Sequence, residues 1–332
     1  MQRKLITIDS YASYGDVYGD YLRQKGYNVK HIFFKDNPPQ MFPSKKQILR
    51  NEITAIFKLI CRINELKDTI VYCRGCHFAV LFLFCIFNQK LRQSHLYLHN
   101  FYLHSLGKKK IIQLILTLLL KPQNIALILQ HPEEEKYYKK LKRNLRTHFI
   151  PYCSDYFPKE YNQEEYSNYI FTGGYTNRDY VLVENLAQLY PLENFIIVAS
   201  ELNQMPSLSN NITLYKQLPR EDFEELLTKS KIVLVPLKDD TGSSGQMLCI
   251  SAMRNRKPII YANVSSINYY FTPESGYPYE IGNVDSIKDA FQKCIDYPNI
   301  SKTMGENAYL ESLKYTCEIE FQTISKILQL NN

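Results

Sequence analysis

The sequence predicts an α/β protein made of two doubly wound domains, each an open parallel sheet covered by helices. The chain has 332 residues, too many for one ordinary hydrophobic core and suited to two domains of roughly 150 residues. Short β-branched segments alternate with helical segments in both halves, which is typical of parallel sheets. The halves also differ in charge: residues 1–160 carry a net charge of +14 and residues 161–332 a net charge of −7.

The first half contains the alternation from its first residues. Strands are expected at residues 5–8, 29–34, 69–72, 95–99, 125–129 and 149–152. Helices are expected between them at residues 18–25, 46–66, 77–91, 111–120 and 132–146. Gly26 ends the first helix, as glycine commonly does after a helix. Residues 153–167 are polar and aromatic and include Pro158, so we divide the domains into residues 1–160 and 161–332.

The second half restarts the same order. Strands are expected at residues 169–171, 195–199, 212–214, 232–236 and 258–261. Helices are expected at residues 180–190, 220–230, 284–297 and directly after Gly245. The run from Ile232 to Pro236 is continuously apolar, as a strand covered on both faces should be. We expect the last helix to pack back on the first domain.

Composition and cysteine usage indicate a cytoplasmic protein. Eight Cys lie mostly inside apolar runs, which favours buried, reduced thiols over a disulfide scaffold. The segment MQRKLITIDS lacks the apolar core of a signal peptide. The longest apolar stretches, residues 78–87 and 111–120, are about half of the ~20 residues that a membrane-spanning helix needs.

One cysteine pair has the spacing of a metal or redox site. Cys73 and Cys76 form a C-x-x-C motif, which suits zinc or a dithiol. No second Cys pair or nearby His pair completes the four ligands of a structural zinc site. We therefore interpret the motif as a strand followed by a helix start, and we expect no metal.

Two loops of the second half have the residues of a phosphate site. Gly173 and Gly174 follow a strand, and Arg178 precedes a helix; glycine allows close backbone approach, and arginine can hold a phosphate with two hydrogen bonds. The second loop, residues 236–246, is rich in Gly and Ser before another helix. Alone, each loop could be a tight turn or a capped helix. Ligands of such sheets bind at the carboxyl ends of the strands, and two loops of this kind in one domain favour the functional interpretation.

On these segments the second half resembles the nucleotide-binding domain of the retaining glycosyltransferases called family four, or group 1. These enzymes have the GT-B fold, in which two Rossmann-like domains face a cleft. The resemblance covers about residues 169–330 and includes the Gly-rich loop. Its other parts are the stretch 211–219, the helix 223–230, the strand 233–237, Ser244-Gly245-Gln246 with Ala252-Met253, and Lys257-Pro258-Ile259-Ile260.

The resemblance assigns roles to individual residues. Gly173, Gly174 and Arg178 would hold the donor diphosphate, and Gln217 and Leu218 would frame the base. The residues that would contact ribose and sugar hydroxyls are Ser243, Ser244, Gly245, Gln246 and Ser251. Many relatives carry two Glu residues eight apart in this region, where this chain has Ser243 and Ser251. A serine cannot place negative charge beside a developing oxocarbenium ion.

The first half resembles the acceptor domain of the same fold, through its strand order and its ending Phe149-Ile150-Pro151-Tyr152-Cys153-Ser154-Asp155. In relatives a His of this domain often lies near the reaction centre. His99, at the end of a strand, is our catalytic candidate, and His131 is the second. The competing interpretation is a histidine that only forms structural hydrogen bonds.

The expected activity is transfer of a sugar from a nucleotide-diphosphate donor to a glycan or lipid-linked acceptor, with retention and without a cofactor or metal. The acceptor would lie in the cleft between domains. Lys108, Lys109 and Lys110 precede an apolar helix and suit contact with an anionic membrane, although a solvated helix end explains them equally. The alternatives are an inactive homologue that binds a nucleotide sugar, a nucleotide-sugar epimerase and, more distantly, a nucleic-acid-binding protein, for which no recognition module is present.

Overall fold

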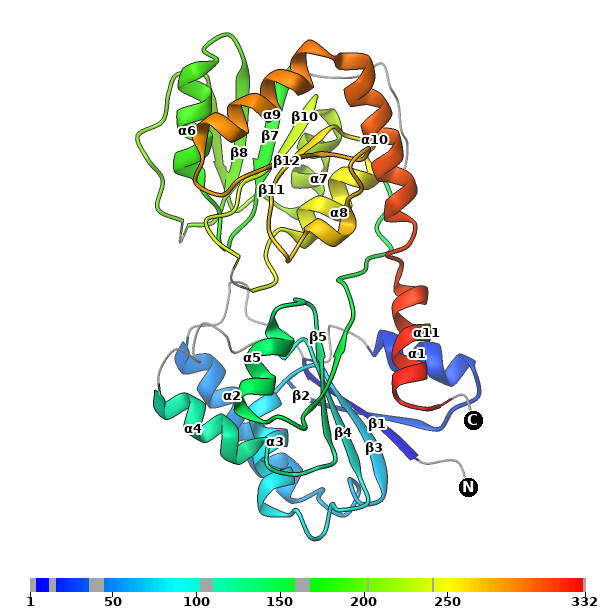
Figure 1. Ribbon diagram of the computed structural model, residues 1–332. Coiled ribbons are helices and arrows are strands. Elements are labelled where there is room, and N and C mark those ends of the chain that lie inside the picture. The colour runs from blue at the N-terminus through cyan, green and yellow to red at the C-terminus, as the bar shows by residue number, and fades with distance from the viewer. Residues whose placement is uncertain are drawn as a thin grey trace. The chain divides into compact units, whose positions relative to one another are not determined.

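The computed structural model describes residues 4–11, 16–35, 45–101, 110–158, 168–201, 203–240 and 242–330. The chain forms two compact units, Met1–Pro151 with Phe321–Asn332, and Tyr152–Glu320 (Figure 1). The sequence placed the boundary nine residues later, between residues 160 and 161. Each unit contains a six-stranded sheet, so the predicted α/β fold with two doubly wound domains is confirmed.

The sheet of the first unit has the order β2-β1-β3-β4-β5-β6, and all its strands are parallel. Its strands are β1 (Lys4–Tyr11), β2 (Val29–Lys35), β3 (Thr69–Cys73), β4 (His95–His99), β5 (Ile125–Leu129) and β6 (Arg146–Phe149). Its helices are α1 (Val17–Gln24), α2 (Lys45–Ile60), α3 (His77–Ile86), α4 (Lys110–Leu119) and α5 (Glu134–Leu141). Figure 1 shows α2 to α5 on one face of this sheet and α1 on the other.

The sheet of the second unit has the order β12-β11-β10-β7-β8-β9, again with parallel strands. Its strands are β7 (Tyr169–Gly173), β8 (Asn194–Ala199), β9 (Ile212–Lys216), β10 (Ile232–Val235), β11 (Ile259–Ala262) and β12 (Tyr277–Tyr279). Its helices are α6 (Tyr180–Leu189), α7 (Arg220–Lys229), α8 (Gln246–Arg254), the 3-10 helix η2 (Asn268–Tyr270), α9 (Val284–Asp296) and α10 (Pro298–Ser312). A last helix, α11 (Cys317–Ile327), follows.

The end of α11 belongs to the first unit, which also contains α1. The Tyr18 hydroxyl lies 3.2 Å from Ser325 Oγ, and Phe321 packs against the ring of Tyr18. The Tyr27 hydroxyl donates to the carbonyl of Leu330. Residues from the two ends of the described chain therefore complete one packed layer.

Several expected elements end elsewhere. The helices expected over residues 46–66 and 77–91 are α2 and α3, which end at Ile60 and Ile86. The helix expected over residues 132–146 is α5, which ends at Leu141, and the strand expected at residues 149–152 is β6, which ends at Phe149. Lys142 has extended backbone, and its Nζ donates to the carbonyls of Leu120 and Pro122. This anchoring turns the chain out of the helix four residues before β6.

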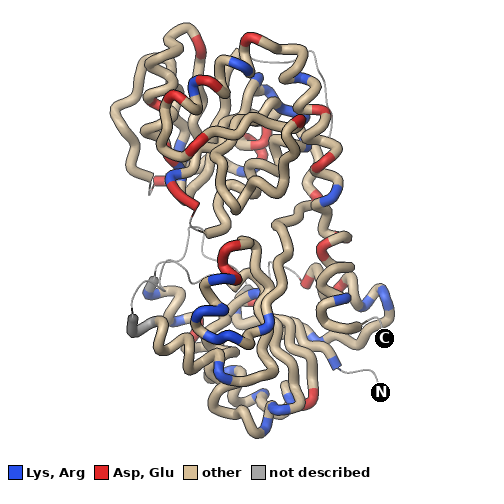
Figure 2. Tube along the Cα trace, in the orientation of Figure 1, with Lys and Arg blue, Asp and Glu red and all other residues tan. Residues whose placement is uncertain are grey.

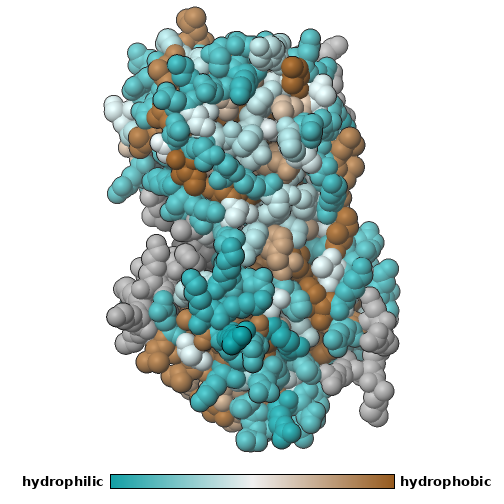
Figure 3. All heavy atoms as spheres, viewed as in Figure 1, coloured by the Kyte–Doolittle hydropathy of each residue, from teal (hydrophilic) through white to brown (hydrophobic). Residues whose placement is uncertain are grey.

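Surface chemistry differs between the units. Figure 2 shows Lys and Arg spread over the first unit with few acidic residues among them. All eight cysteines are free thiols and five are buried, but Cys61 is exposed. In the described part of the chain, the helices are all too short or too polar to cross a bilayer. In the view of Figure 3, hydrophobic side chains gather at the lower left, near α4.

Candidate functional site

The two loops that the sequence nominated lie together in the second unit. Both leave the carboxyl edge of the sheet, one after β7 and the other after β10. The Asp179 N–H donates to the Pro236 carbonyl at 3.1 Å, and the Lys238 N–H donates to the Asn177 carbonyl at 3.2 Å. An isolated β-bridge pairs Arg178 with Leu237. The two loops nominated from the sequence therefore contact each other.

Arg178 is buried at this junction, with a 7% exposed fraction. Its Nε donates to the Gly173 carbonyl and its Nη1 to the Thr176 carbonyl, each at 2.9 Å. Burial lowers the pKa of the guanidinium. The ion pairs between described residues give Arg178 no carboxylate partner. A buried cation without a counter-charge is unfavourable unless an anion binds, so this geometry suits a phosphate.

Gly174 provides the space for that guanidinium. A Cβ on Gly174 would lie 2.3 Å from Arg178 Nη2, and the residue has a φ of +133°. Its N–H donates to the Val198 carbonyl at 3.0 Å, so the amide is occupied by the sheet. Gly173 is crowded in the same way, because a Cβ there would lie 2.5 Å from the Phe223 ring. The glycines thus admit neighbouring side chains rather than present free amides.

The second loop ends at the start of α8. Gly245 is the residue before the helix, with a φ of +88°, and no side chain caps the helix there. Uncapped N–H groups and the helix dipole favour an anion at such an end. Ser243 and Ser244 are half-buried beside it. The start of α8 therefore offers a second set of anion-binding groups in the same unit.

Gln246 supports this loop from inside. Its side chain is buried, and Nε2 donates to the Tyr269 hydroxyl at 2.7 Å and to the Ser266 carbonyl at 3.3 Å. Those bonds tie the first turn of α8 to the segment around η2. In this conformation Gln246 contacts protein groups, and its role toward the donor stays a prediction.

Gln217 and Leu218 follow β9. Gln217 is exposed with a φ of 54°, and its N–H donates to the Ala199 carbonyl at 3.0 Å. Leu218 is half-buried and packs against the core of the unit. Both lie at the carboxyl edge of the sheet, and their role toward a nucleotide base stays a prediction.

Ser251 faces α7 instead of the start of its own helix. Its hydroxyl donates to Glu224 Oε1 at 3.1 Å. Glu224 is 8% exposed, its Oε2 has no hydrogen-bond partner among the described residues, and burial raises its pKa. This carboxyl was missed by the sequence analysis, because Glu224 lies in the charged run Arg220–Glu225, which is typical of a solvated helix.

The histidine candidates lie in the first unit at the carboxyl ends of β4 and β5. His99 is buried beside Tyr72, whose hydroxyl hydrogen-bonds to His99 Nδ1. Burial lowers the pKa of His99 to about 3, so the ring is neutral at ordinary pH. His131 is also buried, and its Nδ1 accepts from the Glu133 N–H at 3.1 Å.

The C-x-x-C motif has the predicted structural place. Cys73 ends β3 and Cys76 precedes α3. Cys73 Sγ donates to the Gly75 carbonyl at 2.9 Å, and Cys76 Sγ lies 3.5 Å from Ser10 Oγ. Both thiols are free. The interpretation as a strand end and a helix start is confirmed.

One group of described residues has metal-ligand geometry. Asp9, Asp16 and His31 each bring one ligand atom within 4.8 Å of the others. Arg23 pairs with Asp16, and Arg74 Nε lies 3.7 Å from Asp9 Oδ1. These cations compete with a metal for the same carboxylates. That the reaction needs no metal stays a prediction.

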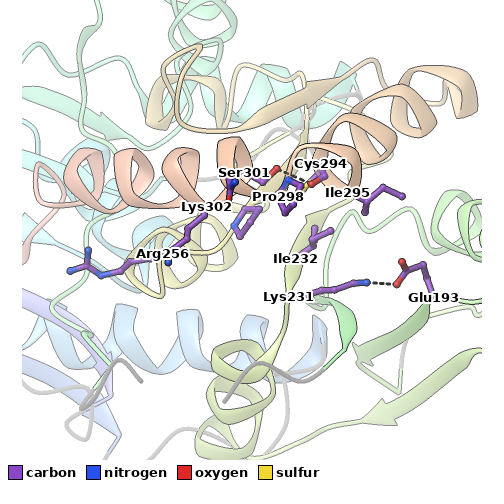
Figure 4. Close-up of a pocket in the computed structure, with 11 residues that line it drawn as sticks. Glu193, Lys231, Ile232, Arg256, Cys294, Ile295, Pro298, Ser301 and Lys302 are labelled. Carbon is purple, nitrogen blue, oxygen red and sulfur yellow. Dashed lines mark hydrogen bonds and ion pairs between the residues drawn. The ribbon is translucent and has the colours of Figure 1, made fainter. Parts of the chain in front are cut away.

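A cavity of about 470 Å³ lies at the opposite edge of the second sheet. Lys231 precedes β10, Pro258 precedes β11, and both line this cavity. Figure 4 shows the ion pair between Lys231 and Glu193 at one side and Arg256 at the other. None of the donor residues nominated from the sequence lines it. Lys108 and Lys109 lie outside the described residues, and of Lys110 only the backbone, which begins α4, is described.

Comparisons with known proteins agree with this architecture. Residues 199–311 match the family model described as glycosyl transferases group 1. No curated protein sequence matches the chain. Among solved structures, sucrose-phosphate synthase from Thermosynechococcus elongatus has a TM-score of 0.72 at 11% identity, with 99% of this chain and 98% of that chain covered.

Two further structures are similar over their whole length. Anabaena HepE in complex with UDP and glucose has a TM-score of 0.69 at 16% identity, with 98% of this chain and 99% of that chain covered. The lipopolysaccharide outer core galactosyltransferase WaaB has a TM-score of 0.61 at 12% identity, with 97% and 98% covered. At these identities the likeness establishes the fold, which is GT-B.

Proposed function

Because residues 199–311 carry the group 1 glycosyl transferase segment within a GT-B fold, we propose that this chain is a sugar transferase. Its donor is a nucleotide-diphosphate sugar, and its acceptor is a glycan or a lipid-linked glycan. The structure of Anabaena HepE holds UDP and glucose, which supports a donor of this class. The family resemblance is the basis for retention of configuration and for a hexose as the transferred sugar.

The observation that carries this proposal is the buried guanidinium of Arg178. It lies against Gly174, in the loop that is hydrogen-bonded to the segment before α8. When the bond between the sugar and the diphosphate breaks, negative charge develops on the leaving oxygen. A fixed cation stabilises that charge without having to reorganise. We assign this role to Arg178 and to the uncapped N–H groups at the start of α8.

We place the acceptor on the first unit, where His99 is the candidate. The neutral imidazole beside Tyr72 can orient an acceptor hydroxyl by hydrogen bonding. A histidine whose pKa is about 3 is a poor proton acceptor at neutral pH. Positioning, rather than general base catalysis, is therefore its proposed contribution.

The reaction is proposed to occur in the cytoplasm, at the inner face of a membrane. Free thiols throughout the chain suit a reducing compartment. A lipid-linked acceptor requires access to a membrane surface, and Lys108, Lys109 and Lys110 are the candidates for contact with anionic lipid.

The second candidate function is a nucleotide-sugar-binding homologue without transferase activity. Ser243 and Ser251 favour it, because neither can supply the negative charge that a Glu pair would provide. Such a protein would bind donor tightly and transfer nothing across a panel of acceptors.

Donor binding is the first test. Thermal unfolding would be followed with UDP, GDP, ADP, CMP and their sugar conjugates, since a ligand that binds only the native state raises the melting temperature. We expect one nucleotide diphosphate to raise it, and Arg178→Gln to abolish the shift. Arg256→Gln is the matched control, because Arg256 has the same charge in the same unit but lies at the opposite edge.

Kinetics then separates the two candidate functions. In an active transferase, Arg178→Gln should lower kcat/KM by roughly tenfold or more, as loss of an oxyanion-stabilising group does. Unchanged kinetics would contradict the proposed role of Arg178 in stabilising the leaving diphosphate. Donor binding without turnover would favour the inactive homologue.

A further inference from the structure

Three helices of the first unit expose large hydrophobic side chains. We call this set the apolar face. Its members on α2, α3 and α4, in order, are Ile48, Leu49, Ile53, Phe57, Ile60, Phe82, Ile86, Leu114, Ile115 and Leu118. Phe57 is 67% exposed and Leu114 is 62% exposed. Single exposed apolar residues are ordinary, but a group of this size on one face commonly marks an interaction surface.

The three helices are neighbours, so their exposed residues share a surface. The Ala79 N–H at the start of α3 donates to Glu52 Oε2 of α2 at 2.8 Å. Cys85 Sγ of α3 donates to the Leu118 carbonyl of α4 at 3.6 Å. The middle helix is therefore α3, and all three lie on the same face of the sheet (Figure 1).

Core packing does not account for this face, because each helix already has a buried side. Ala55 and Leu59 of α2 are fully buried, as is Leu116 of α4. Leu49, Ile53 and Phe57 are spaced by four residues and point outward as a separate row. Figure 3 shows hydrophobic side chains on the surface near α4.

Cations accompany the apolar face. On α2, Lys46 and Arg50 are exposed, and Arg50 directly follows Leu49 of the apolar row. Lys58, which follows Phe57, is also exposed, and its Nζ donates to the Phe34 carbonyl at 2.8 Å. The acidic residue of this helix, Glu52, points to α3. Residues 1–160 carry a net charge of +14. The surroundings of the apolar face are therefore electrostatically suited to an anionic partner.

We propose that the apolar face docks on an anionic phospholipid bilayer, with α2, α3 and α4 lying in the headgroup region. An apolar helix face flanked by Lys and Arg is the pattern of helices that lie in the membrane interface, and cations near an anionic surface strengthen the binding. A second copy of the chain would instead bring two positively charged surfaces together. The inference rests on the proposed function only in that a lipid-linked acceptor gives the docking a purpose.

The test uses the full chain and vesicle co-sedimentation. Vesicles of phosphatidylcholine alone are compared with a mixture of phosphatidylcholine and phosphatidylglycerol. We expect wild type to pellet with the mixture and much less with phosphatidylcholine. The double variant Phe57→Ser, Leu114→Ser should reduce binding to the mixture by roughly tenfold or more. Each substitution removes most of the apolar surface that the side chain would bury in the bilayer.

Two controls define the cause. Leu192→Ser changes a 93% exposed leucine of the second unit and should leave binding unchanged. Lys46→Gln with Arg50→Gln should weaken binding to the anionic mixture and make it less sensitive to salt. Thermal unfolding of every variant confirms that the fold is retained, because all these side chains are exposed.

Three results would overturn the proposal. Wild type could remain in the supernatant with both kinds of vesicle, or the double variant could pellet as well as wild type. Alternatively, wild type could sediment as a dimer that the double variant dissociates, without binding vesicles, which would make the face a contact between copies. Donor-induced thermal shifts on the same samples keep the proposals separate: an absent shift contradicts the transferase, whereas absent pelleting contradicts membrane docking.

Discussion

Arg178 and His99 are both buried, yet burial has different consequences for their charge. The pKa of a guanidinium is so high that burial lowers it without neutralising the group. The pKa of His99 starts near neutrality, and burial takes it to about 3. Arg178 can therefore stabilise an anion throughout the ordinary pH range, whereas His99 can act only as a neutral hydrogen-bonding group.

Glu134, the first residue of α5, makes the stability of the first unit depend on pH. Its side chain is 4% exposed, its Oε1 has no partner among the described residues, and burial raises its pKa to about 8. The folded state then holds a proton that the unfolded chain releases above its ordinary pKa of 4.5. The contribution of Glu134 to the free energy of unfolding should therefore fall as pH rises from about 4.5 and become constant above about 8.

Urea unfolding across this pH range measures the effect. The difference in free energy of unfolding between wild type and Glu134→Gln should fall from pH 5 to pH 8, because the amide does not titrate there and all other titrating groups are common to both proteins. Glu133→Gln is the matched control, since Glu133 is the preceding residue and is exposed. An equal slope in wild type and Glu134→Gln would contradict a buried, protonated carboxyl.

At the scale of elements, the junction of the loops after β7 and β10 requires a residue without a side chain at position 174, which is Gly174. Gly174→Ala should push the guanidinium of Arg178 aside, because the new Cβ would lie 2.3 Å from Nη2. We expect the donor-induced thermal shift to disappear and stability to fall by about 1–3 kcal/mol.

Gly282→Ala provides the comparison for that change. Gly282 also has a positive φ, of +68°, but a Cβ there would have no heavy atom within 4 Å. Its substitution should cost some stability through backbone strain alone and leave donor binding intact. Loss of the donor shift in both variants would show that strain, not displacement of Arg178, is responsible.

The strands were predictable because the central ones are continuously apolar. Residues 125–129 and 232–235 are strands in the structure as expected, and each is buried along its whole length. The strand at residues 277–279 was missed, because its sequence Tyr-Pro-Tyr has no β-branched residue and a proline at its centre. The end of α5 was misjudged because Lys142 forms tertiary bonds that local pattern does not contain.

Hydrophobicity alone could not predict which residues of the apolar helices are buried and which are exposed. The runs at residues 78–87 and 111–120 indicated helices with a core side, and α3 and α4 have one. Nothing local distinguishes Leu116, which is buried, from Leu118, which is exposed. That difference depends on which neighbouring helix covers each side.

The candidate site was also predictable only in part. The sequence nominated the loop of Arg178 and the loop before α8, because each follows a strand of the second sheet and precedes a helix. It could not predict that the Arg178 guanidinium would lie where a side chain at position 174 would be, or that Ser251 would hydrogen-bond to Glu224 of another helix. Those contacts arise from the packing of α7 and α8.

At the scale of the whole molecule, the two units should respond differently to donor. Hydrogen exchange with and without the nucleotide diphosphate that raises the melting temperature would measure this. We expect slower exchange in residues 174–180 and 242–250, which contain the groups proposed to bind the diphosphate, because bound ligand suppresses local opening. Residues 110–151 should change little.

If residues 110–151 were protected by the nucleotide as strongly as residues 174–180 and 242–250, a donor site confined to the second unit would be contradicted. The Arg178→Gln variant is the control, since it should show no protection at the same nucleotide concentration. Residues around the cavity of Figure 4 serve as an internal reference, because they belong to the second unit but lie at the other sheet edge.

The return of residues 321–330 to the first unit has a consequence for biosynthesis. Tyr18 and Tyr27 hydrogen-bond to Ser325 and Leu330, which the ribosome makes after the strands of both sheets. The second unit, Tyr152–Glu320, can thus finish folding before the first, although its residues are made later than β1. Until residues 321–330 have been made, the layer around α1 lacks these partners and stays exposed.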